Sequence, residues 1–129
     1  DFIVEKPAIF LISNEEITGR PMDINTLEPV IKELLVEQDF NFVDDKADAD
    51  YIILIDANIT TSNHHQGIYF AYLDANLSIV STSNSKEIFK THIDQVKGGG
   101  SNHAKAAKKA YLSGSEKLKQ NIQNSILFQ

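Results

Sequence analysis

The chain lacks the residue types that disulfide-rich, membrane-spanning and nucleic-acid-binding proteins depend on. Cysteine is absent, which excludes a disulfide framework and a thiolate metal site. The longest apolar run, residues 51–55, is far shorter than a membrane-spanning helix requires. Lysine and arginine number 12 against 18 acidic residues, giving a net charge of -6. This acidic balance argues against nucleic acid or an anionic membrane surface as the partner.

The length of 129 residues suits one domain, residues 1–129, with an ordinary hydrophobic core. The first residue is not methionine. Either a leader has been removed or the chain is a piece of something longer, so a secretory signal or a lipid-anchored cysteine could precede it. Because Ile126 continues a helical pattern, we expect residues 127–129 to be a native helix end rather than a tag remnant.

Five segments carry the apolar patterns of β-strands: residues 8–12, 40–43, 51–62, 69–80 and 87–96. Apolar and polar residues alternate throughout residues 69–80. This predicts one buried face and a second face that is exposed to solvent at its far end. Residues 14–21 and 63–67 are expected to be loops, and residues 44–50 an acidic connector with a single helical turn. The glycine run 98–100 is expected to end the sheet.

Two segments have helical periodicity. The first is expected over residues 26–38, with Asn25 as its cap, Glu28 as the partner of Asn25 in a capping-box-like pair, and Pro29 in the first turn. Its inward stripe is expected to be Leu27, Ile31, Leu34 and Leu35. The second follows Ser101 or Asn102 as the cap. Residues spaced three, four or seven apart predict its buried face, namely Ala104, Ala107, Tyr111, Leu118, Ile122 and Ile126. Gly114 inside it predicts a close approach of this helix to the sheet.

The resulting element order is β-α-β-β-β-β-α. Three consecutive strands in a meander leave no place for a helix between them, so both helices should cover one face of the sheet. The sequence therefore predicts an α+β two-layer sandwich with a mostly antiparallel sheet and two helices on one face.

Residues suited to metal binding or catalysis form no recognisable set. No acidic or histidine residue stands at ligand spacing from the pair His64 and His65, and His92 and His103 lie elsewhere. Asp44, Asp45, Asp48 and Asp50 lack the order of a calcium loop. No nucleophile elbow is present, and the acidic pairs Glu15–Glu16 and Asp44–Asp45 are expected in loops without an apolar setting. We therefore expect no catalytic residue, no metal and no cofactor.

Three surfaces are candidates for binding. The first is the solvent-exposed end of the strand over residues 69–80, the central strand of the three. It includes Tyr72, Asp74 and Asn76, where an aromatic anchor stands among polar residues. The second is a basic helix face with Lys105, Lys108 and Lys109. The third is an anion site at a glycine loop before a helix, which consists of Gly98, Gly99, Gly100 and Ser101. The simpler interpretation of these glycines is a sharp turn from strand to helix.

From residue 48 onward the chain resembles a group of bacterial envelope proteins. The pattern is Ala49-Asp50-Tyr51 leading a hydrophobic strand, two further strands over 69–80 and 88–95, the glycine run 98–100, and alanines spaced three apart at 104, 107 and 110. This group includes the curli-secretion lipoprotein CsgG, the penicillin-binding-protein activator LpoB, the flagellar ring protein FlgT and the N-terminal domain of TolB.

The resemblance implies a non-catalytic cell-envelope domain, periplasmic or outer-membrane-associated, which binds another envelope protein or itself. One alternative is a small-molecule or anion binder that uses residues 98–101. Another is a lipopolysaccharide-assembly lipoprotein similar to LptE.

Overall fold

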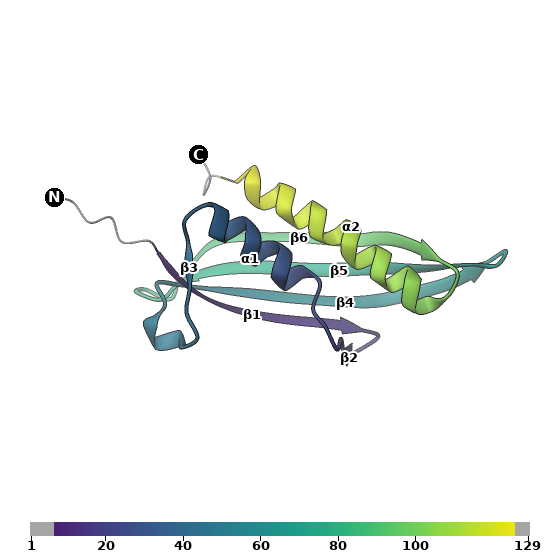
Figure 1. Cartoon of the computed structure of the whole chain (residues 1–129), viewed down its shortest axis with the longest axis horizontal. Coiled ribbons are helices and arrows are strands. Elements are labelled where there is room, and N and C mark those ends of the chain that lie inside the picture. Colours follow the sequence, from purple (N-terminus) through teal and green to yellow (C-terminus); the bar gives the residue numbers. More distant parts are fainter. Residues whose placement is uncertain (1–6, 126–129) are drawn as a thin grey trace.

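The computed structural model describes residues 7–125, which fold into a six-stranded sheet and two α-helices (Figure 1). In chain order the elements are β1 (Ala8–Ile17), β2 (Arg20–Pro21), α1 (Leu27–Glu37), β3 (Asn41–Phe42), the 3-10 turn η1 (Lys46–Asp48), β4 (Tyr51–His65), β5 (Ile68–Ser81), β6 (Glu87–Gly100) and α2 (His103–Gln123). The sheet order is β2-β1-β4-β5-β6, and β3 pairs with β1. The pairs of β1 with β3 and β4 are parallel, and the others are antiparallel.

Both helices lie on the same face of this sheet, so the predicted α+β sandwich is confirmed (Figure 1). Helix α2 packs on β5 and β6, and α1 packs beside α2 against β1 and β3. No helix within residues 7–125 is long and apolar enough to cross a membrane.

The alternation predicted for the central strand decides which side chains form the core. Five inward residues of β5 are buried, namely Ala71, Leu73, Ala75, Leu77 and Ile79. Their partners on β4 are also buried, including Ile53, Ile55, Ala57 and Ile59. Helix α1 closes this layer with the predicted stripe of Leu27, Ile31, Leu34 and Leu35.

The glycine run continues strand β6, so the prediction that it ends the sheet is wrong. Gly98, Gly99 and Gly100 pair with Ala71, Phe70 and Tyr69 of β5. A Cβ on Gly98 would lie 2.2 Å from the backbone nitrogen of Ala110. The glycines at 98 and 100 are therefore needed because the backbone of α2 crosses directly over them.

Two predicted loops are instead strands joined by tight turns. Strand β1 continues to Ile17 and turns at Thr18–Gly19, while β4 continues to His65 and turns at Gln66–Gly67. Both residues of each turn have positive φ, which matches the right-handed twist of the flanking strands. The connector prediction at residues 44–50 is confirmed by the turn η1.

The helix ends differ partly from the prediction. Helix α1 begins at Leu27, with Thr26 at the cap position instead of Asn25 and no capping bond from the Thr26 side chain. Pro29 lies in its first turn, as predicted. At α2, Asn102 is the cap and accepts a 2.8 Å hydrogen bond from the Lys105 nitrogen.

Most of the predicted face of α2 is buried, but Ala104 is exposed because it precedes the region where the helix contacts the sheet. Gly114 is buried at such a contact, where an added Cβ would lie 2.4 Å from Leu73 Cδ2. Ile126 and the expected helix end at residues 127–129 lie outside the described residues.

Candidate functional site

The sheet has one face that no helix of the described chain covers, and we call it the open face. Because side chains alternate along a strand, the residues next to each buried position point there. Its two ends differ in chemistry. We call the end near the β4–β5 turn the aromatic end, which contains Phe70, Tyr72 and Lys97. We call the other end the aliphatic groove, whose floor is Ile12, Ile52, Leu54 and Val80.

The aromatic end contains the predicted anchor Tyr72. Tyr72 and Phe70 are half-buried neighbours on the open side of β5, and Tyr72 pairs with Lys97 of β6. The ammonium of Lys97 lies 4.2 Å from the centre of the Phe70 ring. This cation–π contact places one positive charge over the Phe70 ring.

Asp74, which the sequence suggested as part of an interface, bonds to both neighbouring strands. It accepts a 2.7 Å hydrogen bond from Thr60 Oγ1 on β4 and a 2.8 Å bond from the Gln95 nitrogen on β6. Each strand has an irregularity in register at that place, and Gln95 has a positive φ of 51°. Asp74 thus stabilises two β-bulges. Asn76, two residues further, is exposed on the open face.

The carboxyl of Asp74 is more acidic than an ordinary aspartic acid. Its partial burial raises the pKa, but the hydrogen bonds from the Gln95 backbone, the Thr60 hydroxyl and the Gln95 amide together outweigh that effect and lower the pKa. The ionised form is therefore the one that holds the two bulges.

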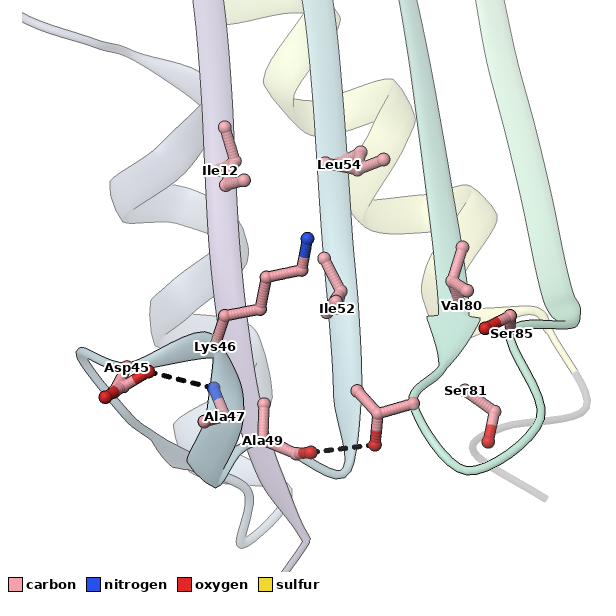
Figure 2. Close-up of a pocket in the computed structure, with 11 residues that line it drawn as sticks. Ile12, Asp45, Lys46, Ala47, Ala49, Ile52, Leu54, Val80, Ser81 and Ser85 are labelled. Carbon is pink, nitrogen blue, oxygen red and sulfur yellow. Dashed lines mark hydrogen bonds between the residues drawn. The ribbon is translucent and has the colours of Figure 1, made fainter.

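The aliphatic groove lies at the opposite end of the open face (Figure 2). It has a volume of about 890 Å³ and is open to solvent on one side. Its floor crosses three adjacent strands, because Ile12 of β1 stands opposite Leu54 of β4, and Ile52 of β4 stands opposite Val80 of β5. Leu54 is 37% exposed, which is high for a leucine in the middle of a central strand.

Two loops wall the groove. The segment around η1 forms one side and the β5–β6 turn forms the other (Figure 2). The hydroxyl of Thr82 donates to the backbone oxygens of Ala49 and Asp50, at 2.8 and 3.0 Å, and so joins the two walls. The side chain of Lys46 extends from η1 across the floor (Figure 2).

The three predicted lysines lie on a different side of the molecule. Lys105, Lys108 and Lys109 are exposed on α2, in the helical layer, whereas Tyr72 belongs to the open face. The structure does not bring these two candidate surfaces together. The predicted anion site loses its loop, since Gly98, Gly99 and Gly100 belong to β6 and only Ser101 lies between that strand and the helix cap.

Three of the four histidines, His64, His92 and His103, contact an aromatic ring or an acid. His64 stacks on Tyr69 at 4.3 Å between ring centres, and His103 meets the same ring edge-on at 4.5 Å. His92 lies 3.4 Å from the carboxylate of Asp94 on the exposed surface. Among residues 7–125, histidine, aspartate and glutamate form no group of three or more that could hold a metal.

The structure also shows where the two predicted acidic loop pairs, Asp44–Asp45 and Glu15–Glu16, lie. Asp45 accepts from the Ala47 nitrogen at 2.9 Å and so starts η1. Glu15, however, belongs to strand β1, and only 2% of it is exposed. The interpretation of Glu15–Glu16 as a loop pair is therefore wrong.

Comparison with known proteins gives a fold-level relationship. No protein-family model and no curated protein sequence matches the chain. A minor lipoprotein of Acinetobacter baumannii is similar with a TM-score of 0.53 and 15% identity, covering 96% of this chain and 92% of that one. Lipoprotein GNA1162 of Neisseria meningitidis has a TM-score of 0.50 and 16% identity, over 92% of this chain and 100% of that one. The PelC dodecamer of Paraburkholderia phytofirmans has a TM-score of 0.50 and 12% identity, over 88% and 85%.

The chain shares its fold with bacterial envelope lipoproteins. This confirms the resemblance drawn from residues 48 onward, at the level of the fold. The envelope-lipoprotein fold does not by itself indicate which surface binds a partner, so that question depends on the side chains of the open face.

The aliphatic groove was not predicted from the sequence. Its floor residues each belong to a strand that was predicted, and alternation places Ile52 and Leu54 on the same side as Asp56. From that alternation, an apolar patch on this side of the sheet could have been predicted. What the sequence did not indicate is that η1 and the β5–β6 turn stand on either side of the floor.

Proposed function

We propose that this chain is a non-catalytic domain of the bacterial cell envelope, periplasmic or lipoprotein-derived, that binds another envelope protein or a second copy of itself through the aromatic end of its open face. The observation that carries the proposal is the pair of aromatic rings, Phe70 and Tyr72, on a sheet face with no helix of residues 7–125 over it. Aromatic residues are enriched at protein interfaces and among the residues that contribute most to binding.

Three further observations support this function. The fold is shared with envelope lipoproteins, and PelC, one of the similar structures, forms a dodecamer. The side chains that favour catalysis are scattered. Asp74 bonds at two bulges, His64 and His103 contact Tyr69, and His92 lies beside Asp94 on the exposed surface. Lys97 beside the rings provides a polar rim for such an interface.

A photo-crosslinking amino acid at position 72 tests the proposal in the envelope fraction of the source organism. We expect it to crosslink to one defined protein or to a second copy. The same probe at Tyr69 is the matched control, because Tyr69 is also half-buried on β5 but lies on the helix side. Equal crosslinking from both positions, or none from position 72, would contradict the proposal.

The captured partner is then purified and titrated with variants. Tyr72→Ala should weaken binding tenfold or more, which corresponds to about 1.4 kcal/mol. Tyr69→Ala should leave the affinity unchanged. Circular dichroism of each variant must match the parent protein, so that a weaker complex reports a lost contact and not a lost fold.

A further inference from the structure

We infer that the aliphatic groove binds a fatty acid, with part of its acyl chain along the floor and its carboxylate at the ammonium of Lys46. This inference does not depend on the proposed protein interface. Val80 of the groove and Tyr72 of the aromatic end lie on the same strand, about 27 Å apart at 3.4 Å per residue.

The floor provides the surface for an acyl chain. Four aliphatic side chains from three hydrogen-bonded strands lie next to one another, with no charged side chain among them. A strip of apolar surface exposed to water favours an apolar ligand, because the ligand removes that surface from contact with water. The groove volume of about 890 Å³ lies within the usual range for ligand pockets, about 300–1,000 Å³.

The charge beside the floor indicates which apolar ligand fits. Lys46 is the only lysine or arginine among the groove-lining residues, and it takes part in none of the ion pairs formed within residues 7–125. The one acidic lining residue, Asp45, is bonded to the Ala47 nitrogen and points away from the floor (Figure 2). The other acids of this connector, Asp44, Asp48 and Asp50, do not line the groove. An aliphatic floor with one lining cation is therefore complementary to a chain with one negative charge.

The walls hold this arrangement in place before any ligand arrives. Thr82 bonds both Ala49 and Asp50 across the closed end of the groove. The 3-10 turn that carries Lys46 is capped by Asp45, so the base of the lysine side chain has a defined position. A preformed site reduces the entropy lost on binding.

Palmitate, titrated below its micelle concentration and followed by calorimetry, tests the inference on the full chain. We expect saturable binding of one palmitate per chain, and fivefold or more weaker binding by Lys46→Gln, which corresponds to about 1 kcal/mol. Lys86→Gln is the matched control, because Lys86 is also exposed but does not line the groove. Its affinity should equal that of the parent protein. Palmityl alcohol, which lacks the charge, should bind the parent protein and Lys46→Gln equally.

A second variant tests the floor. Leu54→Asp should abolish binding of palmitate without unfolding the protein, because the Leu54 side chain already faces solvent in part. Absence of palmitate binding, or full affinity in either Lys46→Gln or Leu54→Asp, would overturn the inference. So would a dimer in sedimentation velocity that Leu54→Asp converts to a monomer, since a second copy of the chain would then occupy the groove.

Discussion

Glu15 is the residue that joins strand β1 to helix α1. Its carboxylate accepts hydrogen bonds from the first three backbone nitrogens at the helix start, those of Thr26, Leu27 and Glu28, at 2.7, 2.6 and 3.0 Å. Ser13 donates a further bond at 2.8 Å. A negative charge at this end of a helix also interacts favourably with the helix dipole. The helix cap is thus provided by a residue eleven to thirteen positions away in sequence.

Glu15→Ala should lower the free energy of unfolding by about 2–3 kcal/mol, because buried backbone N–H groups lose their acceptor. Glu15→Gln should be intermediate, since its amide retains one accepting oxygen. Urea unfolding measures both changes. Glu16→Ala is the control, as this neighbour contributes its backbone oxygen, not its side chain, to the bond from Tyr111. If Glu15→Ala and Glu16→Ala unfold at the same urea concentration, the capping role is wrong.

The three glycines of β6 provide a second test at the scale of single residues. Gly98→Ala should destabilise the protein by about 3 kcal/mol, because the new Cβ meets helix backbone at 2.2 and 2.4 Å. Gly99→Ala should be close to neutral, since its nearest contact is the Phe70 ring at an ordinary 3.4 Å. Thermal unfolding of the two neighbouring variants makes the comparison. A Gly98→Ala protein as stable as Gly99→Ala would show that α2 does not lie on β6 as described.

Gly114→Ala should have an intermediate effect. Helix propensity favours alanine by about 1 kcal/mol, but the new Cβ would lie 2.4 Å from Leu73 Cδ2 and 3.1 Å from Ile93 Cδ1. The ends of these two side chains can move, whereas helix backbone cannot. We therefore expect a loss smaller than that of Gly98→Ala, measured in the same thermal unfolding series. A stability gain would mean that the two side chains adapt without cost.

At the scale of the elements, the side chain of Asp74 links its own strand β5 to both neighbouring strands, β4 and β6. The bulges opposite this residue shift the register of both neighbouring strands, and they separate the part of the sheet under the middle of α2 from the hairpin end with Tyr72. The buried face keeps its alternation on both sides of the bulges, since Ala71, Leu73 and Ala75 are all buried.

The lowered pKa of Asp74 predicts a pH dependence of stability. Because the pKa is lower in the folded than in the unfolded protein, the stabilisation is complete above the unfolded value of about 3.9 and is lost as the pH falls through the folded value. Asp74→Asn should be less stable than the parent protein at pH 6, and the difference should shrink below about pH 4. Urea unfolding at pH 6 and pH 3 measures it. Asp44→Asn, at an exposed position, controls for the loss of a charge, and a pH-independent difference for Asp74→Asn would contradict the prediction.

At the scale of the whole molecule, the two faces of the sheet differ in their cover, because both helices of residues 7–125 lie on one face (Figure 1). The helix-covered face forms the core. There the buried Tyr111 joins helix α2 to strand β1, because its hydroxyl donates a hydrogen bond to the backbone oxygen of Glu16. Burial and then the charge of Glu15 raise the pKa of Tyr111, so the hydroxyl stays protonated. The open face carries the two surfaces that we propose for binding, the aromatic end and the aliphatic groove.

The protein as a whole should bind no metal stoichiometrically, because the histidines lie in separate contacts and the acidic residues of the described chain do not converge with them. Elemental analysis of protein purified without a histidine tag should find well below one equivalent of zinc, copper or calcium. One equivalent retained after dialysis would contradict the prediction.

The amino-acid sequence alone determined the element order, the face of each strand and the inward stripe of α1. These follow from local periodicity, because the positions of side chains on a helix or strand depend only on the backbone repeat. Alternation also placed Tyr72, Asp74 and Asn76 on one face of β5 correctly. The acidic connector and the Asn102 cap were likewise predictable, since each depends on residues a few positions apart.

Only the tertiary structure decided the features that join residues distant in sequence. The Glu15 cap, the bonds of Asp74 to two strands and the need for glycine at position 98 each require a partner 11 or more positions away. The two walls of the aliphatic groove are likewise joined by Thr82 and Ala49, which lie 33 positions apart in the chain. A local pattern contains no information about which distant backbone groups will meet, and that pairing depends on how the helices pack on the sheet.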